Sequence, residues 1–374
     1  MKLASQEMEE KTERLVALCA AEGLAGVLIN SQPNFSWLSG GGTNGVDVSR
    51  EAGVSTLFVR RDGRRFILAS RIEMARMLTE EVNGQGYEPI EFPWEQEKGN
   101  AGLVVDLTRS LVSDDLPIGS DLFLTGARSV EGAIARSRFK LTSFEVDRFR
   151  ALGRDAGKVI GTMARALAPD LSEREVARRT DDALASIGAH SVVTLVAADE
   201  RLTRFRHPLP TDLQWKKVLM IVVCARRGGL IASLTRIVCV GTIPEDLVER
   251  TRAAASVNAQ LFTATRPGVS GSKLYSVAAR AYEDAGFAGE QVLHHQGGAT
   301  GYRTRDWLAH PQCTERVQEN QAFAWNPSIT GTKVEETCIS FAGGIEIITA
   351  TPGWPTVDVE AEGFEYSVPN VLSI

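Results

Sequence analysis

Hydrophobic and polar positions in the first third of the chain follow the periods of helices and strands in turn. Residues 8–22 place their apolar side chains on one side, which predicts an amphipathic helix ended by a glycine. The apolar run at 26–30 predicts a buried strand, and two β-rich runs around an Asp-Gly turn predict a hairpin over 55–69. A helix is expected at about 71–82, so residues 1–135 indicate an α/β domain.

The rest of the chain begins with two helix-capping patterns. Thr142 with Glu145 predicts a helix to about residue 167, and Ser172 with Glu175 predicts one that ends near Gly188. The further elements expected are strands at about 191–197, 217–225, 230–240, 289–296, 321–327, 333–341 and 344–350, and helices at about 243–265 and 272–286. This order of two helices, strands, two helices and strands predicts two similar ααββ halves around a mixed sheet.

Length and composition agree with two globular domains. The chain has 374 residues, 43% hydrophobic and 24% charged, and a formal net charge of -6. We expect domains at 1–137 and 138–374. No basic run builds a phosphate-binding stripe, which argues against nucleic acid as a partner. Scattered cysteines, no apolar signal core and no long apolar run predict a soluble cytoplasmic protein with reduced thiols and no membrane segment.

Five local patterns occur in one order along the chain. They are VLINSQPNFSWLSGG, RFRHPLP, ASLTRIVCVG, HHQGGATGY and WNPSITGTKVEET. Together they resemble motifs of the creatinase, aminopeptidase P and prolidase family, peptidase M24. The resemblance implies an α/β (α+β) fold with a creatinase-like N-terminal domain, a C-terminal "pita-bread" domain of two ααββ halves, and a homodimer.

The resemblance also shows where this chain departs from the family. Family peptidases hold two metal ions with two Asp, one His and two Glu. The matching positions here are an apolar residue within 220–223, Ser233, Gly298, Asn326 and Glu335. One carboxylate cannot retain two divalent cations, so we expect no metal and no cofactor. A metal site would require other ligands such as His294, His295 or Glu336.

Metal-free branches of this fold, such as creatinase and the similar ectoine hydrolase, hydrolyse C–N bonds in small polar molecules. The resemblance implies that His207 acts as general base and acid, a role that suits an imidazole. Glu335 and His295 are the expected catalytic partners. Only one of the neighbours His294 and His295 is expected to face the site, because adjacent side chains of a strand point to opposite sides. The predicted function is a metal-independent hydrolase of an amide or amidine bond.

The substrate of such an enzyme is expected to carry a carboxylate. Two glutamates that bind the cationic substrate of creatinase fall at Thr235 and Asn326 here. In their place the pocket would hold Arg236 and Arg303, with Arg305 and Tyr302 nearby, which suits an anionic or zwitterionic small molecule. A purely structural pair between Arg236 and Glu335 is the alternative.

Three further residues are assigned to substrate binding, each with a plainer alternative. His310 precedes a proline and matches a second proton-shuttling histidine of the family, or is a loop residue. Trp37 and Phe35 cover the pocket from the N-terminal domain or from a partner subunit, or pack in a core.

Two rival functions also remain open: a non-catalytic binding module, as in the peptidase-like domain of the FACT histone chaperone, and an Xaa-Pro-type metallopeptidase with unusual ligands.

Overall fold

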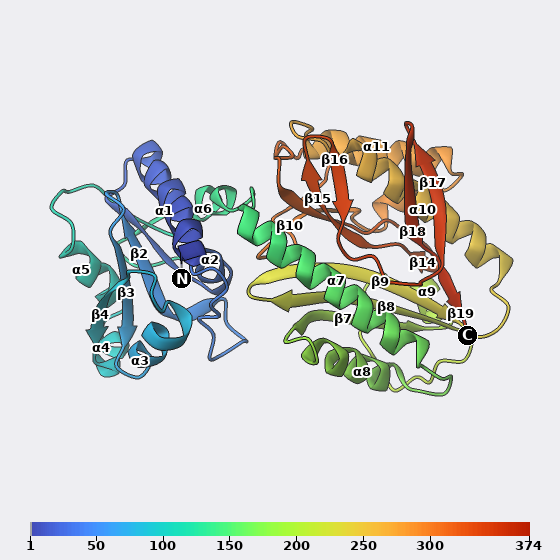
Figure 1. The fold of residues 1–374 in the computed structure, drawn as a ribbon, viewed down its shortest axis with the longest axis horizontal. Coiled ribbons are helices and arrows are strands. Elements are labelled where there is room, and N and C mark those ends of the chain that lie inside the picture. Colours follow the sequence, from blue (N-terminus) through green and yellow to red (C-terminus); the bar gives the residue numbers. More distant parts are fainter. Residues whose placement is uncertain (1) are drawn as a thin grey trace. The chain divides into compact units, whose positions relative to one another are not determined.

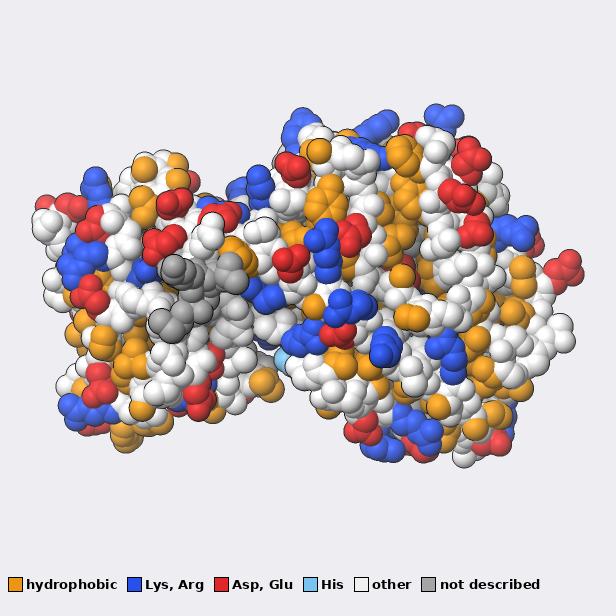
Figure 2. Space-filling model, in the orientation of Figure 1, with side chains coloured by type: hydrophobic (Ala, Val, Ile, Leu, Met, Phe, Trp, Pro, Cys, Tyr) orange, Lys and Arg blue, Asp and Glu red, His pale blue; other side chains and the backbone are white. Residues whose placement is uncertain are grey.

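The computed structural model describes residues 2–374, with side chains from residue 6 onward. The chain divides into two compact units, Met1–Thr142 and Ser143–Ile374 (Figure 1). Each unit combines β-sheet with packed helices, which confirms the expected fold class. Within the described residues, no helix is both long and apolar enough to cross a bilayer. On the face drawn in Figure 2, basic and acidic side chains are intermixed on each unit.

The first unit is built on a mixed six-stranded sheet with the order β4-β3-β2-β1-β5-β6. The elements of this unit are α1 (Lys2–Glu22), β1 (Gly26–Ser31), α2 (Gln32–Leu38), β2 (Ala52–Arg60), β3 (Arg65–Ser70), α3 (Met74–Arg76), the π-helical turn η1 (Met77–Glu81), β4 (Glu88–Phe92), α4 (Trp94–Gly99), α5 (Leu103–Arg109), β5 (Ile118–Ser120), β6 (Arg128–Ser129) and α6 (Glu131–Ser137). The expected hairpin is confirmed, because β2 and β3 pair antiparallel. Its turn contains Gly63 at a φ of +87°, a conformation that glycine adopts without strain.

The second unit consists of two helix pairs, each followed by strands. Its elements are α7 (Ser143–Arg165), α8 (Glu173–Ala185), β7 (His190–Ala198), α9 (Arg201–Arg204), β8 (Val218–Arg227), β9 (Leu230–Cys239), α10 (Glu245–Ala264), α11 (Gly271–Asp284), the 3₁₀ turn η2 (Glu290–Val292), β10 (Gly297–Thr300), β11 (Trp307–Leu308), β12 (Gln321–Trp325), β13 (Ser328–Ile329), β14 (Thr332–Lys333), β15 (Glu336–Phe341), β16 (Gly344–Ile347), β17 (Thr356–Ala361), β18 (Phe364–Pro369) and β19 (Val371–Ser373). The Ser172 hydroxyl accepts from the Glu175 amide at the start of α8, which confirms that capping pattern.

Two sheets form the centre of this unit, one in each half. The first has the order β19-β9-β8-β7 and packs against α7 and α8; the second has the order β11-β10-β12-β15-β16 and follows the α10–α11 pair (Figure 1). The halves meet where the Thr235 amide donates to the Glu335 carbonyl at 3.2 Å. This arrangement confirms the two ααββ halves of the predicted pita-bread domain.

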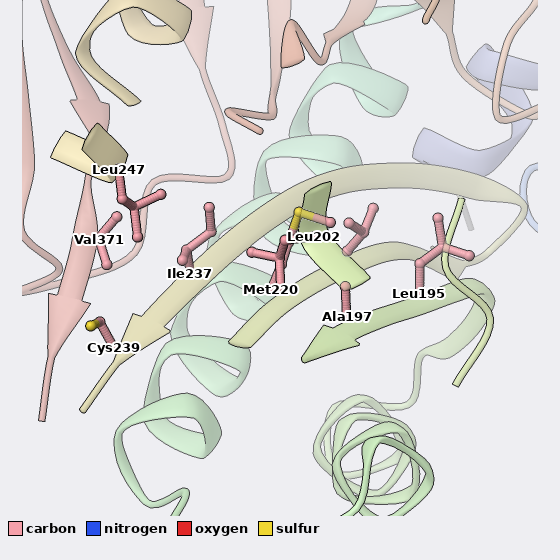
Figure 3. Packing of buried hydrophobic residues seen from close by; sticks show 9 residues of the cluster. Leu195, Ala197, Leu202, Met220, Ile237, Cys239, Leu247 and Val371 are labelled. Atoms are coloured by element: carbon pink, nitrogen blue, oxygen red, sulfur yellow. The ribbon is translucent and has the colours of Figure 1, made fainter. Parts of the chain in front are cut away.

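A buried cluster holds the first sheet against the surrounding elements. Leu195 of β7, Met220 of β8 and Ile237 of β9 pack with Leu247 of α10 and Val371 of β19 (Figure 3). Residues two apart on each strand share this face, as the strand period requires. Burying each large side chain stabilises the fold by about 1.5–3 kcal/mol. The cluster also includes Leu202 of α9, so it fixes the helix after which the loop with His207 begins.

Two stretches differ from the elements expected. The predicted strand at 289–296 is wrong: Gly289 has a φ of +96°, and the 3₁₀ turn η2 follows it. The turn forms because Glu290 accepts hydrogen bonds from the amide and hydroxyl of Thr330, at 3.0 and 2.9 Å. The C-terminal hairpin of β17 and β18 was not expected at all.

Candidate functional site

His207 lies in the loop after α9, and its neighbour Arg206 fixes that loop. The Arg206 guanidinium donates to the Ser328 hydroxyl at 3.2 Å and to the Thr330 hydroxyl at 2.8 Å. It also forms an ion pair with Glu290, at the start of η2. These contacts join the loop of the first half to the second half, which brings His207 to the residues that follow η2.

Three histidines converge at this point. The Nε2 atoms of His207 and His294 are 3.0 Å apart, and the rings of His294 and His295 stack with centroids 4.3 Å apart. One ring nitrogen from each of the three lies within 4.8 Å of the others. The expectation that only one of His294 and His295 faces the site is wrong, because the residues between η2 and β10 are not a strand and strand alternation does not apply.

The surroundings hold all three imidazoles in their neutral form at pH 7. Burial, then Lys333, lowers the pKa of His294 to about 2. Burial, then Arg305, lowers the pKa of His295 to about 4. Burial also lowers the pKa of His207, assisted by Lys333 and opposed by Glu335. A neutral imidazole has a lone pair, so each ring can accept a proton or bind a metal ion.

Glu335 is buried, near enough to His207 and His295 for its charge to raise their pKa values, and it has two cationic partners. Its carboxylate accepts a hydrogen bond from Thr235 at 2.7 Å, and lies 3.4 Å from both Lys333 and Arg305. Burial alone would raise the pKa of Glu335, but the two cations and Thr235 lower it below its usual value. Lys333 was missed in the sequence, although its position two residues before Glu335 is the signal that places both on one side of an extended chain.

Arg236 does not take part in this group. Its guanidinium pairs with Glu336 at 2.8 Å and donates to the Thr349 carbonyl at 2.9 Å. The expected pair with Glu335 is wrong, because Glu335 and Glu336 point to opposite sides of the chain. Arg236 is 1% exposed and its position serves the interior of the unit, so the structure does not bring it to the histidines.

Asn326 and Tyr302 are both buried, with different surroundings. The backbone amide of Asn326 donates to the carbonyl of Gln296 at 3.0 Å, and Gln296 directly follows His295 in the chain. Its side-chain oxygen is buried without a hydrogen-bond partner in the described part of the chain. The Tyr302 hydroxyl donates to Glu145 of α7 at 2.7 Å, which gives Tyr302 a role in packing.

The remaining predicted residues are described by other contacts or by their burial. The Arg303 carbonyl accepts from the Thr300 hydroxyl at 3.0 Å, within a turn. His310 is exposed, and its Nδ1 accepts from the Gln312 amide at 3.3 Å. Trp37 and Phe35 of the first unit are 0% exposed, which agrees with the alternative that they pack in a core.

The two-metal centre of the family peptidases does not fit the residues at the matching positions of this chain. A Cβ atom at Gly298, where the family has its histidine, would lie 2.0 Å from the Trp307 carbonyl oxygen. At the second aspartate position, the Ser233 hydroxyl is buried and donates to the Cys224 sulfur. Glu335 is already neutralised by side-chain cations.

Comparisons with known proteins agree with the fold. The profile of the metallopeptidase family M24 matches residues 147–354, more than half of the chain. An Xaa-Pro dipeptidase of Lactobacillus helveticus is 23% identical over 319 residues, covering 80% of this chain and 86% of the relative. The prolidase structure from Pyrococcus horikoshii OT3 superposes with a TM-score of 0.76 at 18% identity, over 91% of this chain and 98% of that one. The N-terminal domain of the FACT subunit SPT16 from Cicer arietinum has a TM-score of 0.69 at 11% identity, over 92% of this chain and 96% of that one. The chain belongs to the metallopeptidase family M24.

Proposed function

We propose that this protein is a hydrolase of a C–N bond, amide or amidine, in a small molecule that carries a carboxylate, and that it works without a dinuclear metal centre. The observation that carries the proposal is the group around Glu335: two cations, Lys333 and Arg305, face one carboxylate whose charge also acts on His207. In a metallopeptidase the ions would neutralise this carboxylate, whereas here side chains do.

His207 is the proposed general base. When its Nε2–H donates to the Nε2 of His294, its Nδ1 lone pair is free to take a proton from water. The lowered pKa of His207 keeps this lone pair available at neutral pH. After water attacks the carbon, the protonated ring returns the proton to the leaving nitrogen.

Lys333 and Arg305 supply the substrate preference. With neutral histidines, the two cations and Glu335 leave one surplus positive charge in a partly buried place. A substrate carboxylate would neutralise that surplus through charge-assisted hydrogen bonds. Dipeptides with a free carboxylate belong to this class of substrate, as do N-acyl and amidino acids. Because two relatives are named Xaa-Pro dipeptidase, Xaa-Pro dipeptides belong among the compounds to be tested.

The test is a hydrolysis screen of such compounds with chelator-treated protein. We expect turnover that persists in EDTA and falls about 10²–10⁴-fold in His207→Ala, with little change in His190→Asn, a substitution outside the site. Activity that disappears in EDTA and returns with Mn²⁺, Zn²⁺ or Co²⁺ would identify a metallopeptidase instead. Saturable binding of a carboxylate without any turnover would identify a non-catalytic binding module.

A further inference from the structure

We propose that His207, His294 and His295 form a binding site for a single divalent transition-metal ion of the Zn²⁺ or Co²⁺ type, distinct from the two-metal arrangement of family peptidases. Among the described residues, these are the side chains of the His, Cys, Asp and Glu types that gather closely enough to hold an ion. They come from two separate segments, the loop after α9 and the turn after η2.

The distances suit one ion. A tetrahedral centre with metal–nitrogen bonds of about 2.0–2.1 Å places its donor atoms about 3.3 Å apart. The His207 and His294 Nε2 atoms are 3.0 Å apart, and the full set of three lies within 4.8 Å. The rings would have to turn so that the wider separations close when an ion binds. Because His207 is exposed, a fourth position remains open to water.

A second observation points to a ligand at the same place. His294 is 8% exposed, and the Nδ1 atom of His295 is buried without a hydrogen-bond partner in the described part of the chain, so a metal ion could supply that partner. Buried ring nitrogens without partners cost folding free energy, and native proteins keep few of them unless they serve a purpose. His207 packs edge to face on His294, and His294 stacks on His295. Coordination of one cation by the three neutral rings would stabilise them more than these ring contacts do.

The donor set decides which ion binds. Three nitrogen donors favour Zn²⁺, Co²⁺, Ni²⁺ and Cu²⁺ over Mg²⁺ and Ca²⁺, which prefer oxygen. Lys333 and Arg305 oppose a further positive charge, and Glu335 offsets only one of them. We therefore expect reversible binding, weaker than that of a closed four-ligand structural zinc site.

Metal binding has a consequence that rests on the proposed function. A neutral imidazole has one lone-pair nitrogen, and once that nitrogen binds the ion the other carries the hydrogen. His207 would then have no lone pair with which to accept a proton from water. An ion in this site therefore switches off the proposed general base, so the same three histidines act either in catalysis or in metal binding.

The test is a Co²⁺ titration of the full-length, chelator-stripped protein, followed by visible absorption. We expect one Co²⁺ per chain, displaced by Zn²⁺, and at least about tenfold weaker binding in His207→Asn and His295→Asn. His207→Asn changes an exposed residue and so keeps the fold, and His190→Asn, a histidine outside the cluster, should bind as the unchanged protein does. Equal binding by all variants, or none by the unchanged protein, would overturn the inference.

Activity provides a separate reading. For a substrate found in the hydrolysis screen, turnover should fall in proportion to Zn²⁺ occupancy, whereas a rise in turnover with occupancy would overturn the proposed switch. If no substrate is hydrolysed, the proposed function fails while the absorption titration still decides whether the site exists.

Discussion

Glu335 and Glu336 follow each other in the chain and are both buried, at 1% and 2% exposed, but their surroundings differ in charge. Glu336 faces one cation, Arg236, and also accepts a hydrogen bond from the Thr349 hydroxyl. Glu335 faces two cations, Lys333 and Arg305, beside an exposed histidine. The charges around Glu336 therefore cancel and lie in the interior, whereas those around Glu335 leave one positive charge in excess, near a histidine that is exposed to solvent.

This difference in charge distinguishes an ion pair that stabilises the fold from a group of residues that can bind a ligand. The Arg236 guanidinium also donates to the Thr351 hydroxyl and to the backbone carbonyls of Thr235 and Thr349. Its hydrogen bonds are therefore made within the protein rather than to a ligand. Around Glu335, the two cations Lys333 and Arg305 carry one more charge than the carboxylate that they share. A buried surplus charge is costly unless a ligand balances it. We therefore place function on the Glu335 side and stability on the Glu336 side.

The largest effect should come from breaking the balanced pair. Arg236→Met leaves Glu336 buried without its cation, so we expect the free energy of unfolding to fall by about 3–5 kcal/mol. Urea denaturation of the purified variant measures this loss. Adding Glu336→Leu to Arg236→Met removes the orphaned carboxylate and should restore part of the stability. A loss below about 1 kcal/mol in the single variant would remove the structural role assigned to this pair.

A smaller effect should appear with pH on the histidine side. Unfolded His294 takes up a proton below a pKa of about 6.5, while in the folded protein its pKa is lowered to about 2. The unfolded state therefore binds more protons in this window, and stability falls as pH falls from 6.5 towards 2. From pH 7 to pH 5 this histidine alone should cost about 2 kcal/mol.

Urea denaturation at pH 7 and pH 5, with a chelator present, measures the effect of His294. In His294→Asn the difference between the two pH values should shrink by about the same amount. If the unchanged protein and the variant lose stability in parallel, His294 does not carry the effect.

Sequence reasoning reached most of the fold because the long elements carry strong local signals. The capping pattern at Ser172 and the continuous apolar strands β8 and β9 specify their structure locally. The segment 289–296 was missed because its turn depends on Glu290, whose partners Arg206 and Thr330 are distant in sequence. The alternation of Val357 and Val359 was a usable signal for β17 that was overlooked.

The candidate site was reached only in part, for a related reason. Motif order brought His207, Glu335 and Thr235 together in the prediction. In the structure Thr235 donates a hydrogen bond to Glu335, and the charge of Glu335 raises the pKa of His207. The side to which Arg236 points cannot be deduced without knowing how β9 meets β15. The joint presence of His294 and His295 depends on a turn whose contacts are not local.

The smallest effect concerns the surplus charge itself. Lys333→Met leaves Glu335 paired with Arg305 and Thr235, so we expect the fold to persist and the surplus to vanish. A carboxylate-bearing ligand from the hydrolysis screen should then bind about tenfold more weakly, the low end for a lost charged hydrogen bond. Isothermal titration calorimetry measures the dissociation constant, with Lys216→Met as a control because Lys216 is an exposed lysine in the same unit. Unchanged affinity in Lys333→Met would mean that the second cation only neutralises Glu335, and the substrate's carboxylate would have to be recognised elsewhere.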